Sequence, residues 1–186
     1  AASGELRQVT SDLASAWSPS WGPDGDYLFY LSDRHYAPQI SDLEWDYAGN
    51  RRARIFALAL RDDVAPLFPA EDDAVAVRGG GDEGSEESSE EGAEAEDPAI
   101  VADFGGLGLR VMALRGGPDN YGGLSAIDGH LLYTTSGPFV YGGSGGPTVL
   151  HRFSLADREA KEVASGVGGY ALSADRTKML VAKGGA

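Results

Sequence analysis

The stretch Ser18-Pro-Ser-Trp-Gly-Pro-Asp-Gly-Asp-Tyr-Leu-Phe-Tyr-Leu-Ser-Asp33 decides the fold of this chain. Its polar turn, Pro23-Asp24-Gly25, is followed by an apolar and aromatic run from Tyr27 to Leu31 that suits a half-buried strand. Asp24 can hydrogen-bond its own backbone and Gly25 tolerates a positive φ, so the pair predicts a two-residue hairpin turn. The stretch therefore predicts a β-hairpin, with Trp21, Leu28 and Tyr30 as core residues.

The composition favours an all-β chain. Glycine accounts for 27 of 186 residues, about twice the usual share of roughly 7%, and it is spread among short apolar runs. This pattern is typical of many tight turns. The absence of cysteine excludes disulfides, thiolate metal sites and a cysteine nucleophile from these residues. No run approaches the roughly 18 apolar residues of a membrane span, so we expect no membrane segment.

The net charge of −14 is concentrated in one tract. Residues 71–98 hold 12 of the 29 acidic residues and one of the 15 basic residues. The rest of the chain is nearly balanced and has no basic stripe, which disfavours nucleic-acid binding. Within this tract, residues 72–98 contain almost nothing apolar to bury, so we expect them to form a disordered surface loop.

A repeated turn divides the chain into related units. Asp24-Gly25, Asp128-Gly129 and Asp175-Arg176 mark the same position in three units, and the last two turns are 47 residues apart. A period of 40–50 residues with several strands per unit is typical of β-propeller blades. We therefore predict a partial β-propeller of four-stranded antiparallel blades. The predicted divisions are the end of a preceding blade at 1–16, a blade at 17–116 with insertions at 33–50 and 72–98, a blade at 117–166, and the start of a further blade at 167–186.

The order of several motifs resembles the propeller region of bacterial tricorn-like serine peptidases. The first stretch is similar to the Trp-Ser-Pro-Asp-Gly repeat of WD-like propellers in tricorn proteases, TolB and prolyl-oligopeptidase relatives. The further motifs that carry the resemblance are Ser32-Asp-Arg34, Leu43-Glu-Trp-Asp46, Arg54-Ile-Phe-Ala-Leu-Ala-Leu-Arg61, Arg110-Val-Met-Ala-Leu114, Asp119-Asn-Tyr121 and His151-Arg-Phe-Ser-Leu155.

The resemblance implies a part of a large serine peptidase that trims oligopeptides. Its propellers are non-catalytic and admit or guide peptides, and PDZ-like and catalytic domains are expected elsewhere in the longer chain. It also implies a cytoplasmic protein, with the periplasm as the alternative, and allows a homo-oligomer. The alternative hypothesis, from a different functional class, is that the chain is a TolB-like protein-binding propeller without enzymatic activity.

The excursion at 34–52 holds the candidate peptide-contacting residues. Aromatic and arginine side chains on a loop of a rigid scaffold are a common way to build such a surface. The alternative is that they pack the excursion onto its own blade. The candidates are Tyr36, Trp45, Tyr47, Arg51 and Arg52.

Other motifs carry weaker chemical signals, and we expect no catalytic, metal-binding or cofactor-binding residue. Gly142-Gly-Ser-Gly-Gly146 has the spacing of a nucleophile elbow around Ser144, but Pro147 and a strand follow where a helix is required. Gly79-Gly-Gly-Asp-Glu-Gly84 fits a dinucleotide fingerprint, yet it opens an acidic tract that would repel pyrophosphate. The three histidines, which lack the spacing of a metal site, are expected to form surface hydrogen bonds: His35, His130 and His151.

Overall fold

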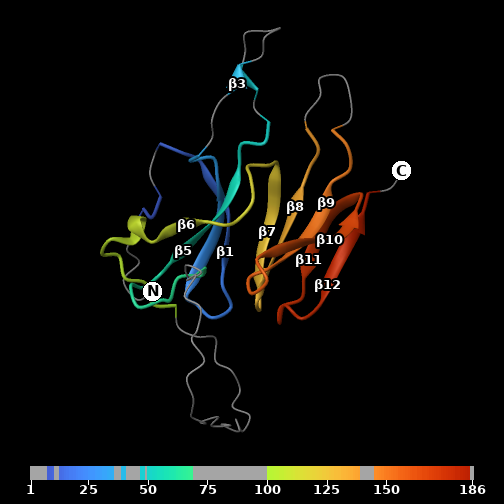
Figure 1. Ribbon diagram of the computed structural model, residues 1–186. Coiled ribbons are helices and arrows are strands. Elements are labelled where there is room, and N and C mark those ends of the chain that lie inside the picture. The colour runs from blue at the N-terminus through green and yellow to red at the C-terminus, as the bar shows by residue number, and fades with distance from the viewer. Residues whose placement is uncertain are drawn as a thin grey trace, which may run out of the picture.

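The computed structural model describes residues 8–10, 13–35, 50–68, 100–138 and 145–184, together with the backbone of 39–40 and 47–48. Twelve strands and one short 3₁₀ turn occupy these ranges (Figure 1). The strands are β1 (Ala16–Trp21), β2 (Tyr27–Ser32), β3 (Gln39–Ile40), β4 (Tyr47–Ala48), β5 (Arg54–Ala59), β6 (Val111–Ala113), β7 (Tyr121–Ile127), β8 (His130–Thr135), β9 (Val149–Ser154), β10 (Glu159–Ser165), β11 (Val167–Leu172) and β12 (Met179–Lys183), and the turn is η1 (Leu107–Leu109).

In the described part of the chain the strands form two four-stranded antiparallel sheets, a two-stranded one that follows them, and a separate two-stranded one that pairs β3 with β4. The first sheet has the order β1-β2-β5-β6, the second β10-β9-β8-β7, and the third contains β11 and β12. Figure 1 shows them following one another in chain order. The prediction of an all-β partial propeller with four-stranded blades is confirmed, whereas the predicted blade boundaries stay predictions. The acidic tract 72–98 lies outside the described residues.

Apolar side chains hold the first two sheets together. β2 and β5 pair along their whole length, with Leu31 opposite Ile55. Because successive side chains of a strand point to opposite faces, one set packs against the second sheet. Leu31 and Leu131 are fully buried in this shared core. The opposite face of the first sheet buries Tyr30 against Phe56 and η1.

Two of the three predicted core residues behave differently from the prediction. Tyr30 is buried as predicted, but Leu28 is only half-buried and Trp21 is 43% exposed. Trp21 is the last residue of β1, at the edge of the sheet, and its ring borders a surface depression beside Ile100. The prediction of a buried Trp21 was therefore wrong, because an edge position at the end of a strand offers too few neighbours to enclose an indole.

The turns also differ from the sequence prediction. Asp24-Gly25 lies in a longer loop, in which the Gly22 amide donates to the Tyr27 carbonyl at 2.8 Å, so the two-residue turn predicted there was wrong. Asp128-Gly129 does form a two-residue connection, because Ile127 pairs directly with His130.

The third turn repeats the first one. The Ser173 amide donates to the Lys178 carbonyl at 2.9 Å, and Arg176 at φ 55° occupies the position that Gly25 holds at φ 74°. In both turns the aspartate accepts a hydrogen bond from the amide two residues later, at 3.1 Å for Asp24 and 3.2 Å for Asp175. The Asp175-Arg176 turn, which lacks the glycine, therefore resembles the Asp24-Gly25 turn more closely in geometry than the Asp128-Gly129 turn does.

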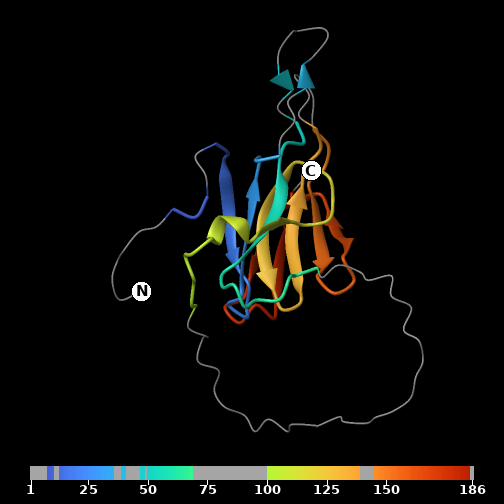
Figure 2. The ribbon, with the colours of Figure 1, turned by 60° about the vertical axis from the view of Figure 1, so that its left-hand side comes forward.

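Figure 2 shows that the turns after β1, β7 and β11 lie at one end of the sheets, whereas β3 and β4 project from the opposite end. The residues that precede β5 and β7 also lie at that opposite end, where an isolated bridge pairs Ala53 with Asp119. The described part of the chain contains no helix long and apolar enough to cross a membrane.

Candidate functional site

The predicted arginines lie where the first two sheets meet at this loop end. Ala53 and Asp119 exchange backbone hydrogen bonds of 3.2 and 2.9 Å, which join the start of β5 to the start of β7. Beside this bridge is a depression of about 300 Å³, which we call the loop-end cleft. It is lined by Trp17, Asn50, Arg52, Ala53, Asp119, Asn120, Tyr121, Ser136 and Gly137.

Asn120 ties the walls of the loop-end cleft together. Its side-chain amide donates to Asn50 Oδ1 at 2.6 Å and approaches the carbonyls of Ser136 and Gly137 at 3.3 Å. Its Oδ1 accepts the backbone amide of Arg51 at 2.8 Å. One side chain thus connects three segments, and this role was missed because its partners lie up to 70 residues away. The only sequence signal was its place in the Asp119-Asn-Tyr121 motif.

The two arginines differ in their surroundings. Arg51 adopts a positive φ of 49°, uncommon for a residue with a side chain, and its Nε lies 3.8 Å from Asp119 Oδ1. Arg52 is exposed at the cleft, and no described residue forms a hydrogen bond or ion pair with its side chain. Arg51 therefore lies beside the cleft, held by residues of its lining, whereas Arg52 lines the cleft and presents a guanidinium that is available to a ligand.

The remaining predicted contact residues cannot be assigned to the cleft. Tyr36 and Trp45 lie outside the described residues, as does Ser144. Tyr47 is described by its backbone alone, which pairs with Ile40 between β4 and β3. Of the five candidates, the structure brings Arg51 and Arg52 to one site.

The histidines lie in separate environments. His151 stacks on Tyr133 with 5.3 Å between ring centroids, and its Nε2 shares a 2.8 Å hydrogen bond with Thr135 Oγ1. His130 Nδ1 lies 2.9 Å from the carbonyl oxygen of Asp128, and the ring of His35 packs edge-on against Phe56.

Tyr133 belongs to an aromatic row that backs the cleft. It also contacts Tyr121 edge-on at 5.3 Å. Burial, with smaller contributions from the nearby Tyr121 and Asp119, raises the pKa of Tyr133 to about 12. The phenols of Tyr133 and Tyr121, whose pKa burial also raises, are therefore neutral over the physiological pH range. Among the described residues there is no group of three or more His, Asp or Glu side chains that could hold a metal ion.

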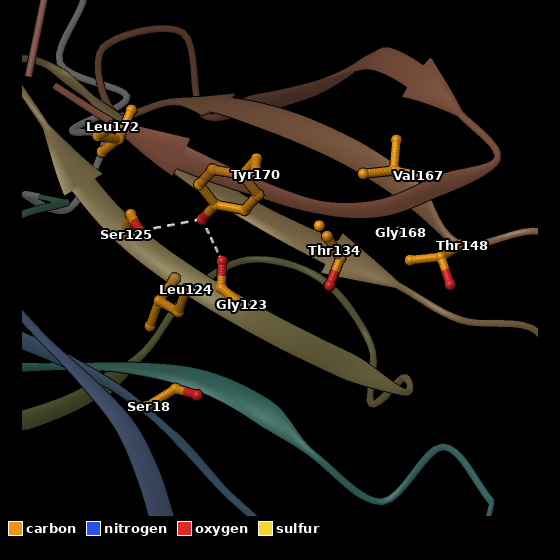
Figure 3. A pocket seen from close by; sticks show the side chains of 11 residues that line it. Ser18, Gly123, Leu124, Ser125, Thr134, Thr148, Val167, Gly168, Tyr170 and Leu172 are labelled. Atoms are coloured by element: carbon orange, nitrogen blue, oxygen red, sulfur yellow. Dashed lines mark hydrogen bonds between the residues drawn. The ribbon is translucent and has the colours of Figure 1, made fainter. Parts of the chain in front are cut away.

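A second depression lies where the first strands of the three sheets approach one another (Figure 3). We call it the central pocket. Its volume is about 480 Å³. Its lining residues are Ser18, Gly123, Leu124, Ser125, Thr134, Thr148, Val167, Gly168, Gly169, Tyr170 and Leu172.

Tyr170 connects the third sheet to the second across the central pocket. Its hydroxyl donates to the Gly123 carbonyl and shares a 3.0 Å hydrogen bond with Ser125 Oγ, as Figure 3 shows. At the turn end, the Arg176 guanidinium donates to the carbonyls of Trp21 and Ala126, both at 3.1 Å. Polar contacts of Tyr170 and Arg176 to main-chain oxygens therefore join the third sheet to the first two. We call the line of these contacts the polar strip.

Comparisons with known proteins connect this fold to one group. No family model matches the chain. A tricorn protease homolog of Saccharolobus solfataricus is 23% identical over 181 residues, which cover 96% of this chain and 15% of the homolog. A putative tricorn-like protease C-terminal subunit of Sulfurisphaera tokodaii is 31% identical over 65 residues, or 35% of this chain and 8% of that protein.

The crystal structure of the tricorn protease has the same fold over 94% of this chain and 16% of its own, with a TM-score of 0.63 and 18% identity. The chain thus spans a small part of the proteins that it matches. A bacterial origin and the WD-like repeat stay predictions. The chain is a partial β-propeller related to a segment of tricorn protease homologs.

Proposed function

We propose that this chain is a non-catalytic propeller segment of a tricorn-like protease that degrades oligopeptides, and that it guides peptides and forms part of the wall of their path. The relation to tricorn protease homologs supports the parent activity. The observation that carries the guiding role is the available guanidinium of Arg52 at the loop-end cleft.

The chemistry of the cleft suits peptide binding. A guanidinium offers several N–H donors in a fixed plane, which suits carboxylates and main-chain carbonyls. Asn120 holds the backbone on both sides of the cleft, so the backbone that carries Arg52 is positioned before a ligand arrives. A preorganised contact loses little of its binding energy to ordering. The cleft would therefore contribute affinity for a part of the peptide remote from the reacting bond.

The test uses the full-length protein and compares Arg52→Ala with Arg152→Ala. Arg152 is an exposed arginine on β9, and it lines neither the loop-end cleft nor the central pocket. It is therefore a matched control. We expect Arg52→Ala to lower kcat/KM about tenfold for peptides of ten or more residues, which corresponds to roughly 1.4 kcal/mol of lost binding. Short reporter substrates should be cleaved at an unchanged rate.

Three outcomes would contradict the proposal. Equal losses on long and short substrates would indicate a general structural defect, and equal effects of the two variants would remove Arg52 from the peptide path. Failure of the full-length protein to cleave any peptide would favour the TolB-like binding propeller instead.

A further inference from the structure

The pairing of β1, β7 and β11, the first strands of three sheets, is interrupted at the central pocket. In β1 the pairing with β2 skips from Trp17 to Ser20, and in β7 the pairing with β8 skips from Gly122 to Ser125. In β11 it skips from Val167 to Gly169. These are β-bulges, which leave a residue unpaired and re-aim the chain. Ser18, Gly123, Leu124 and Gly168 are the pocket-lining residues at these interruptions.

These strands are also edge strands. β1 and β7 each end a four-stranded sheet, and β11 pairs with β12 alone in the described part of the chain. An edge strand presents backbone N–H and C=O groups that an extended peptide can pair with. At the bulges, the side of the edge strand that faces its partner strand also leaves a residue out of the pairing. The central pocket therefore brings together main-chain groups from three strands, of which the Gly123 carbonyl and the Val167 amide already have partners within the chain.

The side chains that line the central pocket carry no charge. Five of them offer hydroxyl groups, and three lining positions are glycines, which leave the backbone accessible. An uncharged pocket cannot compensate the desolvation of a charged side chain. Hydroxyls, by contrast, both donate and accept hydrogen bonds, and so they match the amides of a main chain. A volume of about 480 Å³ is within the usual range of ligand pockets, about 300–1,000 Å³.

Tyr170 gives the pocket a fixed wall. Its hydroxyl is held by the Gly123 carbonyl and by Ser125, and the Leu132 carbonyl lies 3.2 Å away. The anchored ring therefore keeps β11 at a set distance from β7. Desolvation raises the pKa of Tyr170, so the wall stays neutral.

We propose that the central pocket binds the main chain of an extended, uncharged peptide segment with little regard to its sequence. Pairing with backbone groups at the bulges supplies the affinity, and the hydroxyl lining excludes charged side chains. The proposal rests on the peptide-handling role described above, and it assigns that role a second contact point with a different specificity from that of the arginine at the loop-end cleft.

The experiment measures binding without cleavage. Full-length protein is first treated with a covalent serine-peptidase inhibitor. It is then titrated calorimetrically with an octapeptide made only of Ala, Gly and Ser, which is acetylated at its N-terminus and amidated at its C-terminus. The second ligand is the same peptide with alternate amides N-methylated, which removes main-chain donors and keeps the side chains. We expect N-methylation to weaken binding at least tenfold, and a variant peptide with two glutamates to bind at least tenfold more weakly as well.

A glycine variant tests the location. A Cβ at Gly169 would meet no atom within 4 Å although the residue lines the pocket, so Gly169→Phe should fill the space and weaken binding at least tenfold. Gly108→Phe is the matched control, because Gly108 also has open space around it and lies outside the pocket. If Gly169→Phe does not fold, Thr134→Val with Thr148→Val removes two lining hydroxyls at constant shape and should weaken binding at least threefold.

Several results would overturn the proposal. These are equal affinity for the methylated and unmethylated peptides, absence of binding to the capped octapeptide, or equal affinity of the pocket and control variants. If Arg52→Ala leaves the cleavage of long peptides unchanged but these binding differences are observed, the result would contradict the proposed function of the loop-end cleft. It would still support peptide binding at the central pocket.

Discussion

The core between the first and second sheets differs in chemistry from the strip where β11 meets β7. The core is apolar, with Leu31 and Leu131 fully buried on its two sides. Along the strip, Tyr170 and Ser125 make polar contacts around an open pocket. Apolar burial contributes most to folding free energy, whereas hydrogen bonds contribute less and leave room for a ligand. The difference indicates that the apolar core provides most of the stability, whereas the polar contacts leave open the pocket for which we propose peptide binding.

The largest expected effect is on the apolar core. Leu131→Ala should lower the free energy of unfolding by about 2–5 kcal/mol, because it leaves a cavity in a region that cannot collapse around it. Urea denaturation measures the change. Leu180→Ala serves as the control, since Leu180 is 75% exposed on β12, and it should change stability by less than about 0.5 kcal/mol. Similar losses in the two variants would contradict the assignment of stability to this core.

Tyr133 gives the same core a dependence on alkaline pH. Its pKa in the folded protein is raised from 10.0 to about 12, so the folded state favours the protonated phenol. The contribution is fully present below pH 10 and is lost as the pH rises from 10 to 12; it is roughly 2–3 kcal/mol at most. Thermal denaturation between pH 9 and 12 should show a smaller alkaline loss for Tyr133→Phe than for the wild type. Parallel curves would refute the assignment to this tyrosine.

Tyr170→Phe tests the polar strip and should cost about 1–2 kcal/mol, since it leaves the Gly123 carbonyl without its donor. Tyr121→Phe is the comparison variant. It removes one exposed hydrogen bond of 3.0 Å, to the Gly117 carbonyl, and should cost less. Chemical denaturation of both variants gives the ranking. A smaller loss for Tyr170→Phe would mean that its hydroxyl does not hold the third sheet.

The smallest expected effect concerns residues 72–98. Replacing them by a short Gly-Ser linker should shift the thermal midpoint by less than about 2 °C, because the described flanks have anchors of their own. On one side Phe68 packs edge-on against Phe153 and under Arg158. On the other side the Arg110 guanidinium donates to the Gly105 carbonyl at 2.9 Å and to the Asp103 carbonyl.

A drop of several degrees in the midpoint would show that the tract itself supports the fold. An Arg110→Ala variant tests the anchor separately and should lower the midpoint more than the linker does.

Local patterns in the sequence predicted the strands well. The run from Tyr27 to Leu31 forms a buried strand of the first sheet, as its aromatic and aliphatic content indicated, and it pairs with the equally apolar run from Arg54 to Ala59. Asp128-Gly129 predicted a tight turn and forms one. Strand and turn propensities act between residues close in the chain, so they can be read from the chain alone.

Only the tertiary structure decided what individual side chains do. Asn120 joins segments up to 70 residues apart, and Arg176 reaches the carbonyl of Trp21, 155 residues away. Whether Trp21 is buried and whether Arg52 is available depend on neighbours of this kind. Sequence periodicity does not predict these long-range contacts, because each contact depends on how whole sheets pack against one another. The sequence by itself therefore determined an all-β repeat, and the packing of the sheets decided where the proposed peptide-contacting residues lie.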